Sequence, residues 1–301
     1  MARKRKGNPV HGWVVLDKPY GLGSTSAVGK VRWLHMAQKA GHAGTLDPLA
    51  TGILPIALGE ATKTVPFMMD AKKGYKFTLT FGENTDTWDT EGEVTETSDV
   101  RPSECDILQA LPQFIGAIEQ IPPRYSAIKV DGKRSYDLAR SGKVVELKSR
   151  QVIVDGYDLL DFDGQAATFE VACGKGTYIR SLARDLAAAL GTCGHVTMLR
   201  RTRVGPFHLG QSFTLDALEN LCHRGGVSEA LRPVETALDD IPVLALTELE
   251  AIELKHGRAI VLTPSFNAEN SEWILAMEGN KAVALCNTSE GQLRPKKVFN
   301  L

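Results

Sequence analysis

The sequence has few cysteines and lacks any long apolar run. Its five cysteines are odd in number and contain no C-x-x-C pair, which argues against a disulfide framework or a zinc site and for reduced thiols. No stretch of about 18 apolar residues occurs, so no membrane-spanning helix is predicted. The N-terminus, MARKRKGNPVHG, is basic but lacks the apolar segment of a secretory signal. We therefore expect a cytoplasmic protein with no membrane partner.

Sequence motifs for common cofactors are also missing. The chain has neither a G-x-G-x-x-G motif nor a P-loop, and no group of His, Cys and Asp has convincing metal-ligand spacing. We therefore expect a protein that uses no cofactor and no metal.

Positive charge is unevenly distributed, although the formal net charge is only -1. Residues 3–6 form a basic arm, and residues 124–150 hold eight Lys or Arg against three acidic residues. Arg200, Arg201 and Arg203 form a third basic group, whereas acidic residues collect in ENTDTWDTEGEVTET. Local basic patches in a nearly neutral protein indicate phosphate binding on one face. For any single patch, a solvated surface of mixed sign is the alternative.

Length and patterning predict an α+β protein with a large domain and a small one. The chain has 301 residues, 43% of them hydrophobic. Alternation of Tyr75, Phe77, Leu79 and Phe81 with polar residues predicts a half-buried strand. Further strands are predicted at 11–16, 151–162, 167–173 and 195–207, and helices at 27–33, 102–118, 178–191, 214–221 and 228–238. Ser24, Thr25 or Ser26 is expected to cap the first helix, and Ser103 the second.

The residue pattern changes near residue 241, where short predicted strands are separated by Gly and Asn turns. We therefore expect a mixed, largely antiparallel sheet flanked by helices, followed by a small β-rich module. The predicted boundaries are a basic arm at 1–9, a main domain at 10–238 that includes an exposed, RNA-facing segment at about 124–150, and the module at 241–301.

The stretch GHAGTLDPLATG, residues 41–52, carries the best candidate for chemistry. Gly41, Gly44 and Gly52 permit tight or left-handed backbone, and Pro48 directs Asp47 towards an extended conformation. A carboxylate held in a stiff loop suits a nucleophile or general base. The alternative is an Asx-type turn in which Asp47 bonds its own backbone.

Four stretches together resemble one enzyme family. DKPYGLGSTS, GHAGTLDPLATG, KGYKFTLTFG and GTYIRSLARDL, in this order, look like the TruB family of tRNA pseudouridine synthases, and the resemblance covers nearly the whole chain. The last module is similar, over a shorter stretch, to a PUA-type RNA-binding domain. The resemblance implies that one uridine in the T-loop of tRNA, position 55, is flipped out and isomerised to pseudouridine, with no net redox change.

The resemblance also implies roles for residues at the reacting base. Asp47 matches the catalytic aspartate, and Arg180 matches the arginine that keeps it ionised. Tyr75 matches an active-site tyrosine that stacks on the base, Tyr178 lies beside the Asp–Arg pair, and Leu199 packs near the uracil. Without the resemblance, the alternative interpretation of Arg180 is a solvent-exposed arginine. For Tyr75, Tyr178 and Leu199 it is an ordinary core residue.

Three further residues are candidates for RNA contacts. His42 matches the histidine that fills the gap left by the flipped base, although a lone histidine is more often structural. Lys18 and Lys63 are candidate phosphate contacts, with an ordinary surface lysine as the alternative for each. The expected partner is the T-arm of tRNA. No obligate protein partner is evident, and a monomer is the default.

Two other functions remain open at this point. The basic segments fit an RNA-binding or RNA-folding protein without turnover equally well, but such a protein has no need of a rigid carboxylate. A glycosidase that pairs Asp47 with Asp89 or Asp86 is the second, because that chemistry needs two carboxylates. The sequence lacks the aromatic-rich sugar subsites that a glycosidase would need.

Overall fold

The computed structural model describes residues 7–125, 129–130, 133–134, 147–262 and 272–301. Residues 1–6 of the predicted basic arm and most of the predicted RNA-facing segment at 124–150 lie outside the described residues. Within the described part of the chain, no helix has both the length and the apolar character that a membrane crossing requires.

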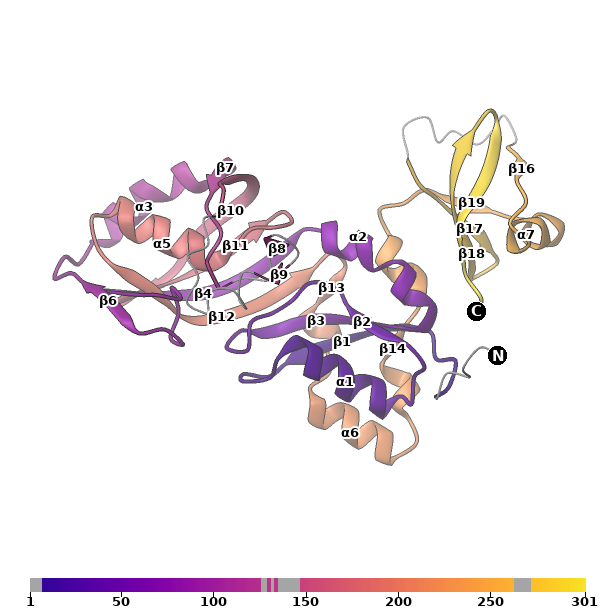
Figure 1. The fold of residues 1–301 in the computed structure, drawn as a ribbon, viewed down its shortest axis with the longest axis horizontal. Coiled ribbons are helices and arrows are strands. Elements are labelled where there is room, and N and C mark those ends of the chain that lie inside the picture. Colours follow the sequence, from indigo (N-terminus) through magenta and orange to yellow (C-terminus); the bar gives the residue numbers. More distant parts are fainter. Residues whose placement is uncertain (1–6, 126–128, 131–132, 135–146, 263–271) are drawn as a thin grey trace.

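The main domain is built on a ten-stranded sheet (Figure 1). Its eight principal strands run in the order β14 (Leu231–Arg232), β1 (Gly12–Lys18), β3 (Thr51–Leu58), β12 (Gly194–Val204), β4 (Lys73–Phe81), β11 (Ala166–Cys173), β10 (Arg150–Phe162) and β7 (Gly116–Gln120). Two short strands complete it: β2 (Ala40–His42) pairs with β3, and β13 (Phe207–His208) pairs with β12. Only the pairing of β3 with β12 is parallel among these, which confirms the predicted mixed, largely antiparallel sheet.

Helices flank the sheet in two groups (Figure 1). Helices α1 (Ser24–Leu34) and α6 (Leu215–His223) lie beside the β1–β3 half, joined by an ion pair between Lys30 and Glu219. Helices α3 (Glu104–Ala110) and α5 (Ile179–Ala189) lie over the other half. The alternation predicted for β4 is confirmed, because Phe77, Leu79 and Phe81 are buried in the core between these layers.

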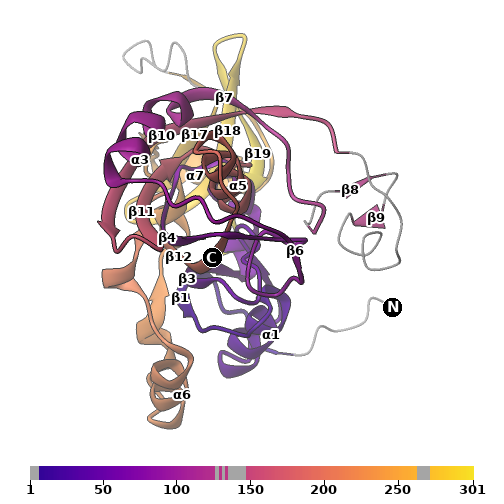
Figure 2. The same cartoon turned by 90° about the vertical axis from the view of Figure 1, so that its left-hand side faces the viewer.

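Shorter elements connect these pieces. The acidic stretch forms a hairpin of β5 (Glu83–Thr85) and β6 (Val94–Thr97), and β8 (Lys129–Val130) pairs with β9 (Lys133–Arg134). Helix α2 (Val65–Asp70) follows the 3₁₀ turn η1 (Gly59–Lys63), while η3 (Leu209–Gln211) precedes α6. In Figure 2, α1, β6, β8 and β9 lie towards the same side of the molecule.

Three helix predictions need correction. The helix expected at 102–118 is only α3 followed by the 3₁₀ turn η2 (Leu111–Phe114), because Pro112 has no N–H and Gly116 turns the chain at φ +93° into β7. The cap at Ser103 is confirmed. No side chain caps α1, whose cap residue is Gly23. The helix expected at 228–238 is two 3₁₀ turns, η4 (Val227–Ala230) and η5 (Val234–Leu238), separated by β14.

The β-rich C-terminal module is confirmed as a five-stranded sheet. Its order is β15 (Val243–Ala245), β17 (Ile274–Glu278), β18 (Lys281–Ser289), β19 (Gln292–Val298) and β16 (Ile260–Val261). One helix, α7 (Glu248–Lys255), packs on it and was not predicted. The capping pair Thr247 and Glu250 was the available signal for α7, but only Ala251 and Leu254 of the helix are buried, so the apolar periodicity is weak.

The module packs tightly on the main domain. Leu275, Leu285 and Phe299 belong to the same buried apolar cluster as Trp13 and Phe207 of the main sheet. Around this cluster, the Phe67 and Trp273 rings meet edge-on at 5.6 Å, and the Lys297 ammonium lies 5.5 Å and 5.8 Å from their respective centroids. The two sheets therefore share part of one core.

Candidate active site

The loop between β2 and β3 holds Asp47 at the edge of the sheet. Gly44 and Gly52 both adopt the predicted left-handed backbone, each with φ +97°. Gly41 is part of β2 and needs no left-handed backbone. A side chain at Gly52 would place its Cβ only 2.1 Å from the carbonyl oxygen of Arg201. Gly52 is therefore required for the parallel contact between β3 and β12 that lies under the loop.

Two buried side chains from earlier in the chain fix this loop. Ser24 Oγ donates to the Leu46 carbonyl at 2.8 Å and accepts from the Leu46 amide at 2.9 Å. Ser24, one of the three residues considered as the cap of α1, therefore holds the loop instead. Lys18 Nζ donates to the carbonyls of Pro48, Leu22 and Pro19 at 3.1, 2.8 and 3.0 Å. The segment before α1 and the Asp47 loop are thereby tied together.

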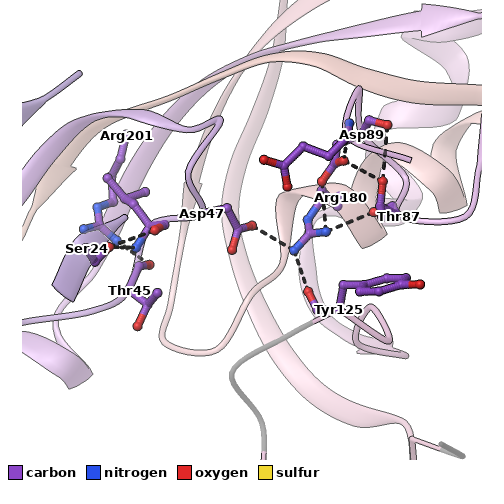
Figure 3. Close-up of polar contacts among 10 residues, drawn as sticks. Ser24, Thr45, Asp47, Thr87, Asp89, Tyr125, Arg180 and Arg201 are labelled. Carbon is purple, nitrogen blue, oxygen red and sulfur yellow. Dashed lines mark hydrogen bonds and ion pairs between the residues drawn. The ribbon is translucent and has the colours of Figure 1, made fainter. Parts of the chain in front are cut away.

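Arg180, at the start of α5, joins Asp47 to a second carboxylate (Figure 3). Its Nη2 donates to Asp47 Oδ2 at 2.8 Å, and its Nη1 donates to Asp89 Oδ2 at 2.9 Å. The same two nitrogens also donate to the carbonyls of Tyr125 and Thr87, at 2.8 and 3.0 Å. The prediction that Arg180 lies beside Asp47 is confirmed by this contact, and the alternative of a solvent-exposed arginine is wrong.

Exposure separates the two carboxylates that share Arg180. The side chain of Asp47 is 36% exposed, whereas those of Arg180 and Asp89 are 5% and 1% exposed. Asp89 Oδ1 also accepts from Thr87 Oγ1 at 2.6 Å and from the Glu91 amide at 3.0 Å. Asp89 is thus a buried support for Arg180, and Asp47 is the carboxylate that a substrate can reach.

Asp47 borders a cavity of about 230 Å³. This volume is many times the roughly 10–15 Å³ that one water molecule needs. Four of the predicted residues line the cavity with Asp47, namely Tyr75, Tyr178, Arg180 and Leu199. They come from β4, the segment before α5, α5 itself and β12, so the fold brings together residues that are far apart in the sequence.

The two tyrosines that line the cavity have different surroundings. Burial raises the pKa of the Tyr75 hydroxyl, and nearby Cys173 and Asp47 act in the same direction against the opposing effect of Arg201, so Tyr75 is protonated at neutral pH. Tyr178 precedes α5 and is fixed through its backbone. Gln120 accepts from its amide at 2.8 Å and donates to its carbonyl at 3.1 Å, and the Arg150 guanidinium lies 5.0 Å from its ring centroid.

Comparison with known proteins identifies the family. A model of the "TruB family pseudouridylate synthase (N terminal domain)" matches residues 32–179, and one of the "tRNA pseudouridylate synthase B C-terminal domain" matches residues 180–239. A protein of Caulobacter vibrioides named tRNA pseudouridine synthase B is 57% identical over 309 aligned residues, with 100% of both chains covered. The chain belongs to the TruB family of pseudouridylate synthases.

Further relatives agree with this TruB assignment. The tRNA pseudouridine synthase B of Bradyrhizobium diazoefficiens is 53% identical, covering 100% of this chain and 91% of that protein. A solved structure described as a Cbf5-Nop10-Gar1 complex contains a chain with a TM-score of 0.73 and 27% identity, covering 96% of this chain and 84% of its own. The boundary between the two TruB models is not a structural one, because β12 lies between β3 and β4 of the same sheet.

The remaining predicted residues of this TruB chain lie outside the cavity. His42 is half-buried at the end of β2, opposite Ile56 of β3. Lys18 is fully buried, and its ammonium is committed to three carbonyls, so a phosphate would have to displace them. Lys63 Nζ lies 2.5 Å from Glu60 Oε2 and donates to the Val298 carbonyl at 2.6 Å, which places it in the contact with the C-terminal module. The predicted phosphate contacts of both lysines stay predictions.

Sequence reasoning missed a group of buried cations around the site. Arg201 is 1% exposed and donates from Nε to the Ile53 carbonyl at 2.7 Å, and from Nη2 to the Gly44 carbonyl at 3.1 Å. Lys73 donates to three carbonyls at the end of α2. Burial lowers the pKa of both Lys18 and Lys73 to about 8. The basic group at 200–203 is therefore not a surface patch, since Arg200 pairs with Asp17 and only Arg203 is exposed.

Proposed function

We propose that this chain isomerises uridine 55 in the T-loop of tRNA to pseudouridine, with Asp47 as the catalytic carboxylate. Membership of the TruB family makes it a tRNA pseudouridine synthase, an isomerase. The choice of position 55 and the residue roles rest on the family resemblance of the motifs. The observation that carries the proposal is the pair in which a buried Arg180 holds a reachable Asp47 at the mouth of a cavity.

The reaction needs only rearranged bonds. The bond between uracil N1 and ribose C1′ breaks, and a bond between C5 and C1′ forms. C5 loses its proton and N1 gains one, so atoms and electrons balance without an oxidant or reductant. An anionic Asp47 fits three roles in this sequence, as a nucleophile at C1′, as a nucleophile at the base, or as the base that removes the C5 proton. Arg180 stabilises the anion and fixes its direction.

The cavity residues suit a flipped base. Tyr75 and Leu199 offer a flat ring and an apolar side chain on the cavity wall, while Tyr178 borders it near Asp47. Extruding a base costs a few kcal/mol of stacking energy. His42 precedes the Asp47 loop and would fill the gap left in the T-loop. We propose that the segment at about 124–150 and the module at 241–301 add phosphate contacts, and that the enzyme acts as a cytoplasmic monomer with no obligate protein partner.

The deciding experiment is Asp47→Asn, assayed on tRNA that carries tritium at uracil C5. The amide keeps the shape of the side chain but is a far poorer nucleophile and base. We expect no detectable tritium release and near-normal tRNA affinity, because affinity comes mainly from phosphate contacts. Asp161→Asn, which changes an exposed carboxylate on β10, is the matched control and should keep full turnover.

Each alternative makes a different prediction for the same assay. A binding protein without turnover predicts that wild type binds tRNA and releases no tritium. A glycosidase predicts that Asp47→Asn abolishes activity on sugars and that the wild type releases no tritium. It needs a second carboxylate that can reach the same substrate, whereas Asp89 is 1% exposed and bound to Arg180, and Asp86, although exposed, does not line the cavity. Substantial turnover by Asp47→Asn would remove the catalytic assignment.

A further inference from the structure

Two large apolar side chains are exposed at the end of α1. Trp33 is 72% exposed and Met36 is 63% exposed, and they lie three residues apart. The buried face of α1 is formed instead by Ser24, Ala27, Val31 and Leu34. Neither Trp33 nor Met36 therefore contributes to holding the helix on the sheet.

The backbone at Met36 makes this exposure more unusual. The helix ends in a Schellman motif, in which the Met36 amide donates to the Trp33 carbonyl and the Ala37 amide to the Arg32 carbonyl, each at 2.9 Å. Met36 occupies the left-handed position of this motif with φ +49°. Glycine is the residue that suits this position, because it pays no penalty for a side chain there. A strained, exposed methionine is thus kept where glycine would give a more stable protein, which points to a role at the surface.

The charge around the pair is positive. Arg32 and Lys39 are exposed, and among the described residues neither forms an ion pair. Glu219 of α6, the acidic residue that contacts α1, is neutralised by Lys30 at 2.5 Å. The C-terminal end of a helix carries partial negative charge, which accounts for a basic residue at Arg32. It does not account for the two exposed apolar side chains beside Arg32.

The patch is connected to the catalytic loop. Lys39 directly precedes β2, which ends at His42, and a chain of eight residues spans at most about 28 Å, so Lys39 lies within that distance of Asp47. Gly7 and Asn8 run beside the patch, where the Asn8 amide donates to the Met36 carbonyl at 2.6 Å and Gln38 Nε2 donates to the Gly7 carbonyl at 2.9 Å. A tRNA bound with its target base at Asp47 can therefore also contact this surface.

We propose that Trp33, Met36, Arg32 and Lys39 form an RNA-binding platform, on which an unpaired base of the tRNA stacks while the two cations contact its phosphates. An exposed indole between basic side chains is the arrangement by which proteins bind single-stranded nucleic acid with little sequence preference. The inference rests on the proposed tRNA substrate. It adds a contact outside the catalytic cavity that raises affinity for tRNA and takes no part in bond making.

The test compares the affinities of four variants for an unmodified tRNA transcript at one fixed salt concentration. Trp33→Gln should weaken binding at least fivefold, whereas Trp33→Phe, which keeps a stacking ring, should stay within about twofold of wild type. Leu108→Gln, at a half-exposed apolar residue of α3, is the control and should not change affinity. Met36→Gly should raise the free energy of unfolding and yet weaken tRNA binding, a combination that a purely structural role does not produce. Turnover at saturating tRNA should be unchanged in all four.

Tryptophan fluorescence supplies a readout that is independent of activity. The difference in acrylamide quenching between wild type and Trp33→Phe isolates Trp33, and bound tRNA should protect it. Trp33→Gln binding within twofold of wild type, or a Trp33 that stays equally accessible with tRNA bound, would overturn the proposal. So would sedimentation data showing that the patch joins two copies of the chain. A wild type with Trp33-dependent tRNA binding but no turnover would instead overturn the proposed function alone.

Discussion

Arg180 is the residue on which the arrangement of the site depends. One guanidinium bonds two carboxylates and two carbonyls while it is 5% exposed. Removing one partner from such a buried network leaves charges unpaired, which is far more costly than losing a surface ion pair. The geometry of the guanidinium is therefore expected to matter as much as its charge.

Arg180→Lys tests this expectation while keeping the positive charge. A lysine offers a point charge on a flexible stem and cannot reach Asp47 and Asp89 with two separate planar donors. We expect the turnover rate to fall by at least tenfold, equivalent to about 1.4 kcal/mol of barrier, with tRNA affinity nearly unchanged. Single-turnover tritium release on prebound tRNA measures this directly. A rate within about threefold of wild type would show that the planar, two-donor geometry of the guanidinium is not required.

Lys73 makes a pH-dependent contribution to stability that can be measured. Burial lowers the pKa of its ammonium from 10.5 to about 8 in the folded chain. Between these pH values the unfolded chain keeps a proton that the folded chain has released, so the free energy of unfolding rises with pH. The expected slope approaches about 1.4 kcal/mol per pH unit, with no contribution below pH 7. Buried Lys18, whose pKa is also lowered to about 8, adds a similar rise, so the contribution of Lys73 is the difference between two curves. Urea titrations from pH 7 to 10 should show a steeper rise in wild type than in Lys73→Met, which keeps the Lys18 contribution; parallel curves would contradict the desolvation of Lys73.

Sequence reasoning found the residues that line the cavity better than the residues that support them. The TruB motifs pointed to Asp47, Arg180, Tyr75, Tyr178 and Leu199, which the fold brings to one cavity. Lys18, Lys73 and Arg201 were missed as supports because buried cations are rare, and a lysine or arginine seen without its neighbours reads as surface. Their partners are backbone carbonyls, which carry no signal in the sequence.

The loop and the parallel strand pair beneath it form the element that positions Asp47. Gly52 faces the β12 backbone, with no room for a Cβ beside the Arg201 carbonyl, and its φ is +97°. Local patterning predicted β4 and α5 well, because their periodicity records a single buried face. It did not predict that β3 pairs with β12, since the two segments are more than a hundred residues apart and neither one encodes its partner.

Gly52→Ala should therefore disrupt this element. The added methyl group combines a steric clash with a left-handed backbone that alone costs an L-residue about 1–2 kcal/mol, so we expect a loss of more than about 2 kcal/mol. Gly41→Ala is the matched control, since Gly41 is extended in β2 and a Cβ there meets no atom within 4 Å. Chemical denaturation of both variants measures the difference. Equal stabilities would mean that β3 and β12 separate easily.

At the scale of the whole molecule, the two largest sheets of the described residues share a core. Leu275, Leu285 and Phe299 of the module are buried with Trp13 and Phe207, and the Lys63 ammonium bonds the Val298 carbonyl across the same contact. The change of residue pattern near residue 241 predicted the module but not its packing on the main domain. The apolar residues of β18 that face the main domain cannot be told from the sequence apart from those that face the module's own core. The two parts are expected to depend on each other for stability.

Calorimetry of the full chain should show this dependence as one cooperative transition. Because a shared apolar cluster is lost when either sheet unfolds, the calorimetric and van't Hoff enthalpies should agree. Phe299→Ala should lower the single midpoint without splitting it, while Leu249→Ala, at a 76% exposed residue of α7, should change it little. Two separate transitions in the wild-type chain would show that the sheets fold independently.

The central position of β12 also determines when, during synthesis, the enzyme becomes active. Among the described strands, β12 alone links β3, which follows the Asp47 loop, to β4, which carries Tyr75. A ribosome that has reached residue 190 has already incorporated Asp47, Tyr75 and Arg180, yet the two halves of the sheet have no common strand. The reactive groups can take their final positions only after residues 194–204 insert between β3 and β4. Nascent chains that stop earlier should therefore contain the chemistry of the site without its activity.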